Sequence, residues 1–267
     1  MQRAPFGAPD PTSHTAKVGA EMRNERGGMG TNVFLAGATG ATGAIGRRLT
    51  PLLLDAGFTV TGLTRNPARA RELERGGIRA AVGDVYDAAA LCAAVAAANP
   101  EIVVHQLTDL PQSREDRADP KALERNARVR IEGTAHLVGA ALRSGAKRII
   151  AQSIAFAYAA GLEPHAESDP LDAQTRASVI ELERLVLESP PLIGTVLRFG
   201  SFYGPGTWAN EPAGNLPLHV DAAAWATLLA IQRSAAGVFN VAEERGYVTT
   251  VRARDALGWH AGFRLPS

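Results

Sequence analysis

The sequence predicts an α/β fold, a doubly wound parallel sheet with a small, shortened lobe at the carboxyl end. Two observations lead to this prediction. Short runs rich in β-branched residues alternate with longer helical patterns, as is typical of strand–helix–strand units. In addition, a glycine-rich turn joins the first of these runs to the first helical pattern.

The predicted strands are short apolar runs, and polar or turn-forming residues separate them from the helical patterns. The strand candidates are 32–36, 59–63, 79–82, 102–106, 148–152 and 193–198. The helix candidates between them include 45–56, 88–98 and 122–142. Crossovers in such sheets are right-handed, so the carboxyl ends of the strands share one edge, where ligands bind. After residue 198 we expect a helix at 221–232, a strand at 238–241 and a terminal helix ending near Leu257.

Composition narrows the classes of function. The chain has 267 residues, of which 46% are hydrophobic, so it can bury a substantial core. Its 28 Lys and Arg against 27 Asp and Glu leave a net charge of +1, which is not the basic footprint of a nucleic-acid binder. The single cysteine, Cys92, forms no internal disulfide, and no apolar run approaches the ~20 residues that span a bilayer. We therefore expect a cytoplasmic protein with neither nucleic acid nor membrane as a partner.

Residues 1–30 are rich in Pro and Gly and have no apolar periodicity, which predicts a disordered leader. They contain no apolar segment of signal-peptide length. The acidic residues Asp10, Glu21 and Glu25 argue against an organellar transit peptide. Met22 and Met29 are alternative starts of the chain.

The glycine-rich turn reads GATGATGAIG over residues 37–46 and directly follows the first predicted strand. A turn of this kind brings backbone N–H groups against a pyrophosphate, where any Cβ would block the approach, and the following helix adds its dipole. The pattern therefore predicts a dinucleotide site, and the alternative is a merely tight turn. The residues expected in this part of the site are Gly37, Thr39, Gly40, Gly43, Ile45 and Gly46.

Because Gly-Ala-Thr occurs twice, two registers of the glycine fingerprint are possible. One register uses Gly37, Gly40 and Gly43, and the other uses Gly40, Gly43 and Gly46. An insertion of three residues in the turn explains why both registers are present. If it pushes the turn outward, the affinity for the pyrophosphate falls.

The residues after the second and third strands bear on the choice of cofactor. The second strand ends in Thr64-Arg65-Asn66, without the carboxylate that would bind an NAD ribose. Arg65 suits a 2′-phosphate instead and favours NADP over NAD, the alternative being a solvated loop arginine. Asp84 is placed to meet the adenine, although it could equally cap the next helix. Val85 and Leu107, near the ends of the third and fourth strands, complete the predicted cofactor site.

Several further motifs follow the turn in a characteristic order. They are Gly83-Asp84-Val85, Val103-Val104-His105-Gln106, Gly133-Thr134, the stretch from Gly145 to Ser153, Leu197-Arg198, and Phe202-Tyr203-Gly204-Pro205-Gly206. In this order the chain resembles the extended short-chain dehydrogenase/reductase family, in its NAD-dependent epimerase/dehydratase branch. The resemblance spans nearly everything from Thr31 onward. It implies a Rossmann-type NAD(P)-binding domain, which we place at 31–200, with the lobe at 201–267 packed on it.

The resemblance also implies a catalytic tyrosine whose pKa is lowered by a lysine four residues later. None of the four tyrosines of this chain has a lysine at that spacing, and the segment 174–183, where the pair belongs, contains neither residue type. Ser153 fits the family's hydroxyl position and Tyr158 follows it closely, so we predict these two as catalytic. The alternative for both is structural hydrogen bonding. His105, His165 and Glu167 are weaker candidates, and no metal-ligand spacing is present.

The resemblance implies an oxidoreductase or epimerase that binds NADP or NAD. Only a short segment separates Gly206 from His219, where the family commonly carries a longer one, so we expect a small carbonyl or hydroxyl substrate. A non-catalytic NADP-binding sensor or scaffold is the alternative. A homodimer through helices 122–142 and 178–188 is possible.

Overall fold

The computed structural model describes residues 30–37, 43–111, 113 and 115–266. The predicted leader, apart from Gly30, lies outside the described residues. So do Thr39 and Gly40 of the glycine-rich turn.

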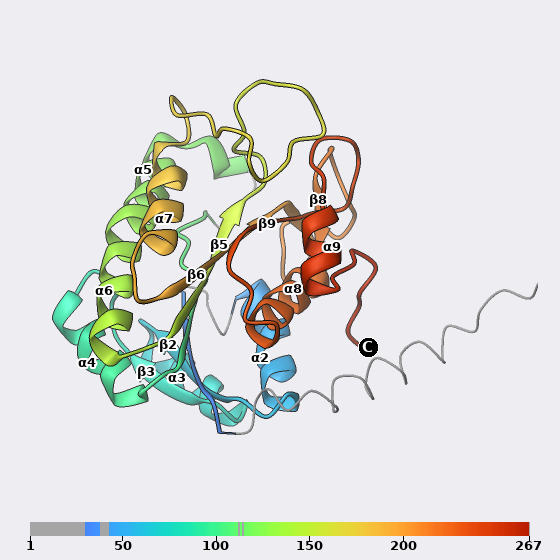
Figure 1. Cartoon of the computed structure of the whole chain (residues 1–267). Helices are drawn as coiled ribbons and strands as arrows, with labels where there is room; N and C mark the ends of the chain where they lie inside the picture. The colour runs from blue at the N-terminus through green and yellow to red at the C-terminus, as the bar shows by residue number, and fades with distance from the viewer. Residues whose placement is uncertain (1–29, 38–42, 112, 114, 267) are drawn as a thin grey trace, which may run out of the picture.

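A seven-stranded parallel sheet forms the centre of the protein (Figure 1). Its strand order is β3-β2-β1-β4-β5-β6-β9, which reverses direction between β1 and β4, so the predicted doubly wound sheet is confirmed. The strands are β1 (Asn32–Ala36), β2 (Thr59–Thr64), β3 (Arg79–Val82), β4 (Ile102–His105), β5 (Arg148–Ile154), β6 (Ile193–Phe199) and β9 (Gly237–Val241).

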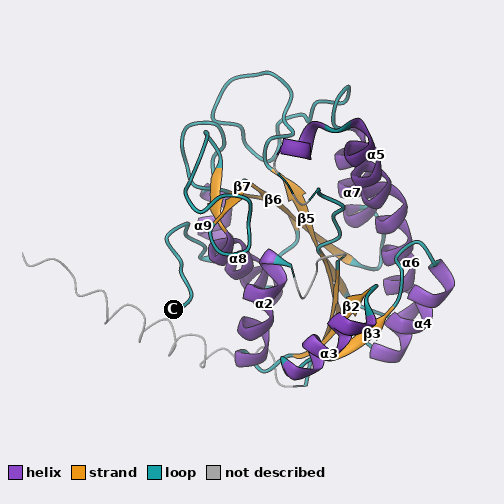
Figure 2. Cartoon of the chain, turned by 180° about the vertical axis from the view of Figure 1, so that it is seen from behind, coloured by secondary structure: helices purple, strands orange, loops and turns teal. Residues whose placement is uncertain are grey.

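Helices cover both faces of this sheet, as Figures 1 and 2 show from opposite sides. One face carries α2 (Ala44–Asp55), α3 (Pro67–Arg75), α8 (Val220–Gln232) and α9 (Val251–Leu257). The other carries α4 (Ala88–Ala98), α5 (Pro120–Arg128), α6 (Thr134–Ser144) and α7 (Ala177–Leu187). A short 3-10 helix, η1 (Glu115–Ala118), precedes α5.

Successive residues of a strand feed two separate cores. In β1, Val33 and Leu35 join the core under α2 and α8, whereas Phe34 and Ala36 join the core under α4 and α6. Both sets are buried, because helices cover each face of the parallel sheet. This explains why the predicted strands are continuous apolar runs.

The predicted helix at 122–142 corresponds to one long helical run with an irregular middle. A π-helical segment, η2 (Val129–Gly133), joins α5 directly to α6. Such segments occur often at functional sites.

Residues beyond the predicted boundary at 200 also build the sheet. β9 pairs in parallel with β6, and α8 packs against α2. The short strands β7 (Ser201–Tyr203) and β8 (Pro217–His219) pair with each other apart from the main sheet. The predicted carboxyl-terminal lobe is therefore continuous with the nucleotide-binding layers.

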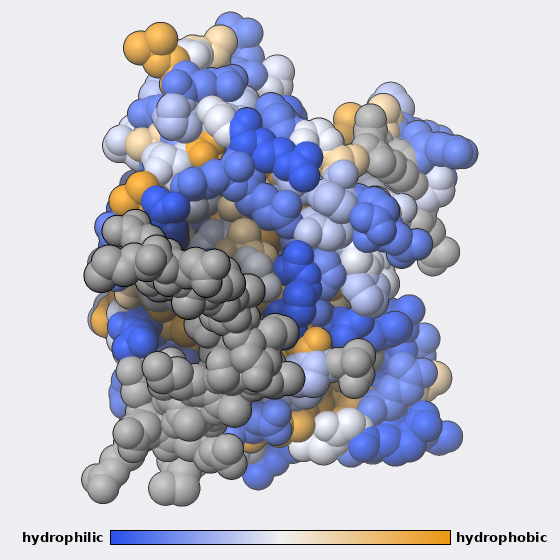
Figure 3. All heavy atoms as spheres, turned by 90° about the vertical axis from the view of Figure 1, so that its right-hand side faces the viewer, coloured by the Kyte–Doolittle hydropathy of each residue, from blue (hydrophilic) through white to orange (hydrophobic). Residues whose placement is uncertain are grey.

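The surface on the side of α9 is mainly hydrophilic among the residues that are coloured (Figure 3). Among the described residues, no helix combines the length and the apolar character required to cross a membrane.

Candidate cofactor and active site

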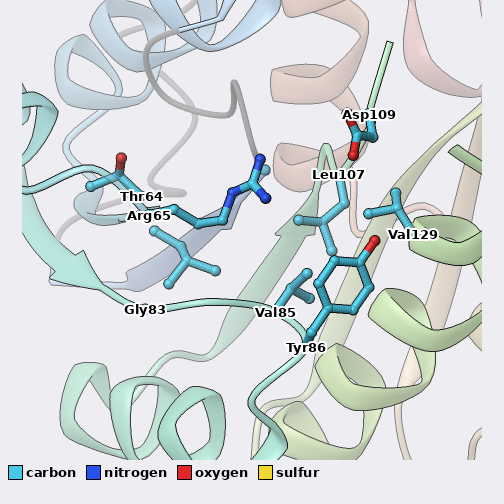
Figure 4. Close-up of a pocket in the computed structure, with 10 residues that line it drawn as sticks. Thr64, Arg65, Gly83, Val85, Tyr86, Leu107, Asp109 and Val129 are labelled. Atoms are coloured by element: carbon cyan, nitrogen blue, oxygen red, sulfur yellow. The ribbon is translucent and has the colours of Figure 1, made fainter. Parts of the chain in front are cut away.

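A hollow lies at the carboxyl ends of β1 to β4, beside the point where the strand order reverses (Figure 4). This is the place where doubly wound sheets bind ligands. Its lining residues are Gly37, Leu63, Thr64, Arg65, Gly83, Val85, Tyr86, Leu107, Asp109 and Val129. The fold thus brings together four of the predicted cofactor residues, Gly37, Arg65, Val85 and Leu107.

The wall of the hollow is apolar and closely packed. Val85 and Leu107 are both buried, and Gly133 of the π-helical segment lies against them. A Cβ on Gly133 would sit 3.4 Å from a methyl of Val85, so a larger residue would push on this wall. The carbonyl oxygen of Val85 lies 2.9 Å from Nδ1 of His136, which ties the loop after β3 to α6. An apolar wall of this kind suits an adenine ring.

Arg65 stands at the opening of the hollow and is exposed. Figure 4 shows its side chain extending from the end of β2 toward the space that Val85 and Leu107 line. Asp109 also lines the hollow, and its Oδ2 lies 4.0 Å from Nε of Arg125. A guanidinium in this position fits a phosphate group on a bound ribose.

Asp84 forms a local turn after β3. Its carboxylate accepts the backbone N–H of Tyr86 at 3.0 Å. The cap of α4 is Asp87, which accepts the N–H of Ala90. Asp87, and not Asp84, therefore caps the helix. The contact of Asp84 with adenine stays a prediction.

The described end of the glycine-rich turn leads into α2. Gly43 is the extended N-cap residue of α2 and supplies no side chain, and the first turn of this helix contains no acidic residue. Ile45 is buried, and Gly46 lies inside the helix. Gly206 of the Tyr203–Gly206 motif approaches Ala44 closely enough that a Cβ would sit 3.7 Å from its Cα. The amino end of α2 thus offers free N–H groups and a positive dipole to an anion.

Ser153 and Tyr158, the predicted catalytic pair, belong to a buried polar network. The Ser153 hydroxyl donates to Glu183 at 2.6 Å. Glu183 in turn accepts two hydrogen bonds from Arg198, at 3.0 and 2.7 Å. Arg198 also donates to the Tyr158 oxygen at 2.8 Å, and Tyr158 donates to Asn240 at 2.7 Å. The network links β5, α7, β6 and β9.

Within this network, Tyr158 has no feature of an activated acid or base. Burial raises the pKa of its phenol, and this effect outweighs the influence of the adjacent Arg198, which lowers the pKa. Its oxygen is already engaged by both Arg198 and Asn240. The geometry therefore favours structural hydrogen bonding, the alternative that the sequence left open for Ser153 and Tyr158.

The segment where the family's Tyr and Lys belong forms the start of α7. The Thr175 hydroxyl donates to Asp172. Val179 is buried, and Arg176 is the half-buried N-cap residue of the helix. In the part of the chain that the structure describes, this segment thus offers no phenol and no amine for proton transfer.

The weaker candidates also make interior contacts. His105 is fully buried, with Nδ1 accepting the N–H of Leu107 and Nε2 lying 2.7 Å from the Thr134 hydroxyl. Burial lowers the pKa of His105 to about 4. His165 stacks on the Tyr158 ring, and Glu167 accepts the backbone N–H of Asn240. Among the residues the structure describes, no group of three or more His, Cys, Asp or Glu side chains could hold a metal ion.

Sequence reasoning missed the partners that fix this network. Glu183, Arg198 and Asn240 were not predicted as site residues, although all three are buried. One signal was available. An arginine inside a mainly apolar predicted strand, such as Arg198, requires a carboxylate partner once the strand is buried, because an unpaired buried charge is costly.

Comparisons with known proteins agree with this geometry. A family model described as NAD(P)H-binding matches residues 40–207. The chain is 42% identical over 233 residues to a 3-diazoavenalumate denitrifying reductase of a Streptomyces species, covering 77% of this chain and 74% of that one. It is also 31% identical over 172 residues to a dTDP-4-dehydrorhamnose reductase of Streptomyces griseus, covering 63% and 50% of the two chains.

Solved structures show the same fold at low sequence identity. A UDP-glucose 4-epimerase from Stenotrophomonas maltophila, with bound NAD and formylated UDP-arabinopyranose, superposes with a TM-score of 0.72 at 17% identity, covering 88% of this chain and 94% of that one. A UDP-glucose 4-epimerase from Thermotoga maritima, with UDP-glucose, gives a TM-score of 0.68 at 18% identity, covering 87% and 94%. The chain therefore belongs to the NAD(P)H-binding family, as an enzyme related to a reductase, and it shares the fold of the UDP-glucose 4-epimerases.

Proposed function

We propose that this protein is an NADPH-dependent reductase that removes the diazo group of a small organic compound. The support is the 42% identity, over most of both chains, to a relative whose name describes denitrifying reduction of a diazo compound. The other relative is a reductase named for a dehydro-sugar nucleotide, and it is more distant.

The start of α7 is the observation that carries this choice. Reduction of a ketone leaves an alkoxide, which needs a proton from a positioned acid. The described side chains at the start of α7 offer a threonine bound to Asp172, a half-buried arginine and the buried Val179. A substrate whose reduction creates no alkoxide has no need of the missing pair.

A diazonium group meets that condition. The cofactor supplies a hydride, and R–N₂⁺ plus hydride gives R–H plus N₂, so charge and atoms balance without a proton donor. The task of the protein is then to bind, orient and exclude water.

The proposed cofactor contacts follow from the hollow and the amino end of α2. Gly37, Thr39, Gly40 and Gly43 would hold the pyrophosphate together with the first turn of α2, where Ile45 and Gly46 lie. Val85 and Leu107 would hold the adenine, with Asp84 at its edge, and both form a buried wall. Arg65 would bind the 2′-phosphate, so we propose NADP rather than NAD.

Ser153 and Tyr158 have a positioning role in this proposal. Their hydrogen bonds to Glu183 and Arg198 hold α7 against β5 and β6. They would keep the substrate side of the site rigid without exchanging a proton.

The predicted homodimer is part of the same proposal. Apolar side chains are exposed on α5, on the π-helical segment and on α6 and α7, namely Leu123, Ile131, Leu142 and Leu187. Sedimentation of purified protein should give twice the monomer mass. A Leu123→Lys change should shift it to the monomer, and sedimentation of the unchanged chain as a monomer at all concentrations would contradict the dimer.

Turnover of a defined diazo compound tests the function. The purified protein would be mixed with NADPH and the diazonium salt of 3-aminocinnamate, with absorbance at 340 nm, N₂ release and cinnamate formation followed together. We expect cinnamate to form faster with the enzyme than without it. With NADPH deuterated at C4, we expect this cinnamate to contain one deuterium. Reduction of aldehydes or ketones without N₂ release would point to a carbonyl reductase instead. Tight NADPH binding without turnover of either class would favour the non-catalytic alternative.

A further inference from the structure

Two arginines near the start of α7 have no side-chain hydrogen bond or salt bridge to any other described residue. Arg130 lies on the π-helical segment η2, and Arg176 is the N-cap residue of α7. Both are half-buried. Within the described part of the chain, neither side chain makes a hydrogen bond or an ion pair.

The two guanidinium groups lie close enough to act on each other. α7 packs against the π-helical segment, which brings the elements together. Burial, and then the charge of Arg176, lowers the pKa of Arg130 to about 10. The charge of Arg130 also acts on His105 at the end of β4. Arg130 is therefore placed between the end of β4 and the start of α7, at the carboxyl edge of the sheet.

The carboxylates near these arginines accept hydrogen bonds from other groups. Asp172 accepts the hydroxyl of Thr175 and the N–H of Gln174, and the charge of Arg176 contributes to lowering the pKa of this carboxyl. Glu183 is bound by Ser153 and Arg198. Among the described residues, no carboxylate forms a salt bridge with Arg130, whose charge is therefore left for a ligand.

Neighbouring arginines on the same helices show the contrast. Arg128, two residues before Arg130 at the end of α5, forms two hydrogen bonds with Glu132. Arg184, further along α7, does the same with Glu181. These pairs are exposed to water, whereas the unpaired arginines are half-buried, where an anion would be held more strongly.

The amino end of α7 adds to the positive electrostatic potential of the two arginines. Its first turn, all of it described, contains no acidic residue, and no side chain caps it. The positive end of the helix dipole therefore points at an anion bound near Arg176. Two guanidinium groups and a helix amino end together form a site for a carboxylate.

We propose that Arg130 and Arg176 bind a carboxylate of the substrate and so orient the diazo group for hydride delivery. This inference rests on the proposed function, since the relative's substrate is named as the anion of an acid. The ligand class is a small diazo compound that carries a carboxylate.

A binding measurement tests the site without turnover. Calorimetric titration of the NADP⁺-loaded protein would compare cinnamate with cinnamamide, which has the same shape but no charge. We expect cinnamate to bind at least about tenfold more tightly, as a charge-assisted bond implies. Arg130→Gln and Arg176→Gln should each remove that preference and leave NADP⁺ affinity unchanged, and Arg130→Lys should keep part of it. Arg184→Gln, a charge change on the exposed part of α7, serves as the matched control and should bind like the unchanged protein.

The outcomes separate this inference from the proposed function. Equal binding of cinnamate and cinnamamide by the unchanged protein would overturn the carboxylate site, even if diazo compounds are reduced. Loss of NADP⁺ affinity in Arg130→Gln and Arg176→Gln would overturn it as well, by assigning the arginines to a cofactor phosphate. Arginine-dependent cinnamate binding without reduction of any diazo compound would support the site and reject the proposed function.

Discussion

Arg198 lies in β6 and Arg130 lies on the π-helical segment η2, and their surroundings differ. Arg198 is buried and bound by both oxygens of Glu183, so its charge is neutralised and it stabilises the fold. Arg130 is half-buried and has no carboxylate partner among the described residues. The first arginine holds elements together, and the second is free for a ligand.

We expect the cofactor preference to depend on Arg65. Replacing Arg65 by Asp removes the cation that we propose for the 2′-phosphate and adds a carboxylate suited to a ribose hydroxyl. We expect the ratio of NADPH to NADH affinity to fall by at least about tenfold and to reverse. Fluorescence titration with both nucleotides measures this. Arg71→Asp, the same charge change on the exposed side of α3, should leave the ratio intact, and an unchanged ratio in Arg65→Asp would reject the assignment.

Tyr158 is expected to stabilise the protein without taking part in proton transfer. Tyr158→Phe leaves Asn240 and Arg198 each without one buried hydrogen-bond partner. The free energy of unfolding should fall by about 1–3 kcal/mol, while kcat changes by less than about tenfold. Urea denaturation and steady-state kinetics measure the two effects. A folded variant whose kcat fell more than a hundredfold would restore the predicted catalytic role.

At the scale of elements, α7 is fixed to the sheet by one buried charge pair. Glu183→Gln would leave Arg198 charged and without its carboxylate in the interior. We expect a loss of about 3–5 kcal/mol in the free energy of unfolding. Glu181→Gln, on an exposed face of the same helix, should cause little change because water screens its pair with Arg184. Chemical denaturation measures the free energy of unfolding of both variants. An equal decrease in both would show that the buried pair stabilises the protein no more than the exposed pair.

Three elements have the bounds that the sequence predicted. β1, β3 and α4 have the predicted bounds. The sequence did not predict α3, PARARELER, because only Ala70 and Leu73 of this helix are buried and the rest is charged or small. Nor did it predict the π-helical segment, because the apolar pattern continues through Val129–Gly133 without a break.

The site was predictable on the cofactor side and not on the substrate side. Gly37, Arg65, Val85 and Leu107 each follow a strand, and strand ends meet at one edge, so the residues that line the hollow could be named in advance. The bond between Tyr158 and Asn240 joins residues 82 positions apart on elements whose pairing no local pattern fixes. The same reason hid the proximity of Arg130 and Arg176.

For the whole molecule, one buried histidine predicts how stability depends on pH. The folded protein keeps His105 neutral down to about pH 4, whereas the unfolded chain binds this proton near pH 6.5. Since the unfolded state binds more protons in this interval, the free energy of unfolding should fall as pH drops from about 6.5 to 4, by up to roughly 3 kcal/mol. Denaturation curves at several pH values measure this. His105→Gln should lack this part of the acid sensitivity, and an identical pH dependence in both proteins would contradict it.

The sequence by itself determined the strand–helix alternation, the glycine-rich turn and the absence of the Tyr/Lys pair, because each is a property of residues close together in the chain. The tertiary structure decided how those parts are used. It placed β9 and α8 in the main layers and enclosed Ser153 and Tyr158 in a buried network. It also left Arg130 and Arg176 without a salt bridge to any other described residue. The physical reason is that burial and ion pairing depend on which distant segments pack together, and a local pattern carries no information about that packing.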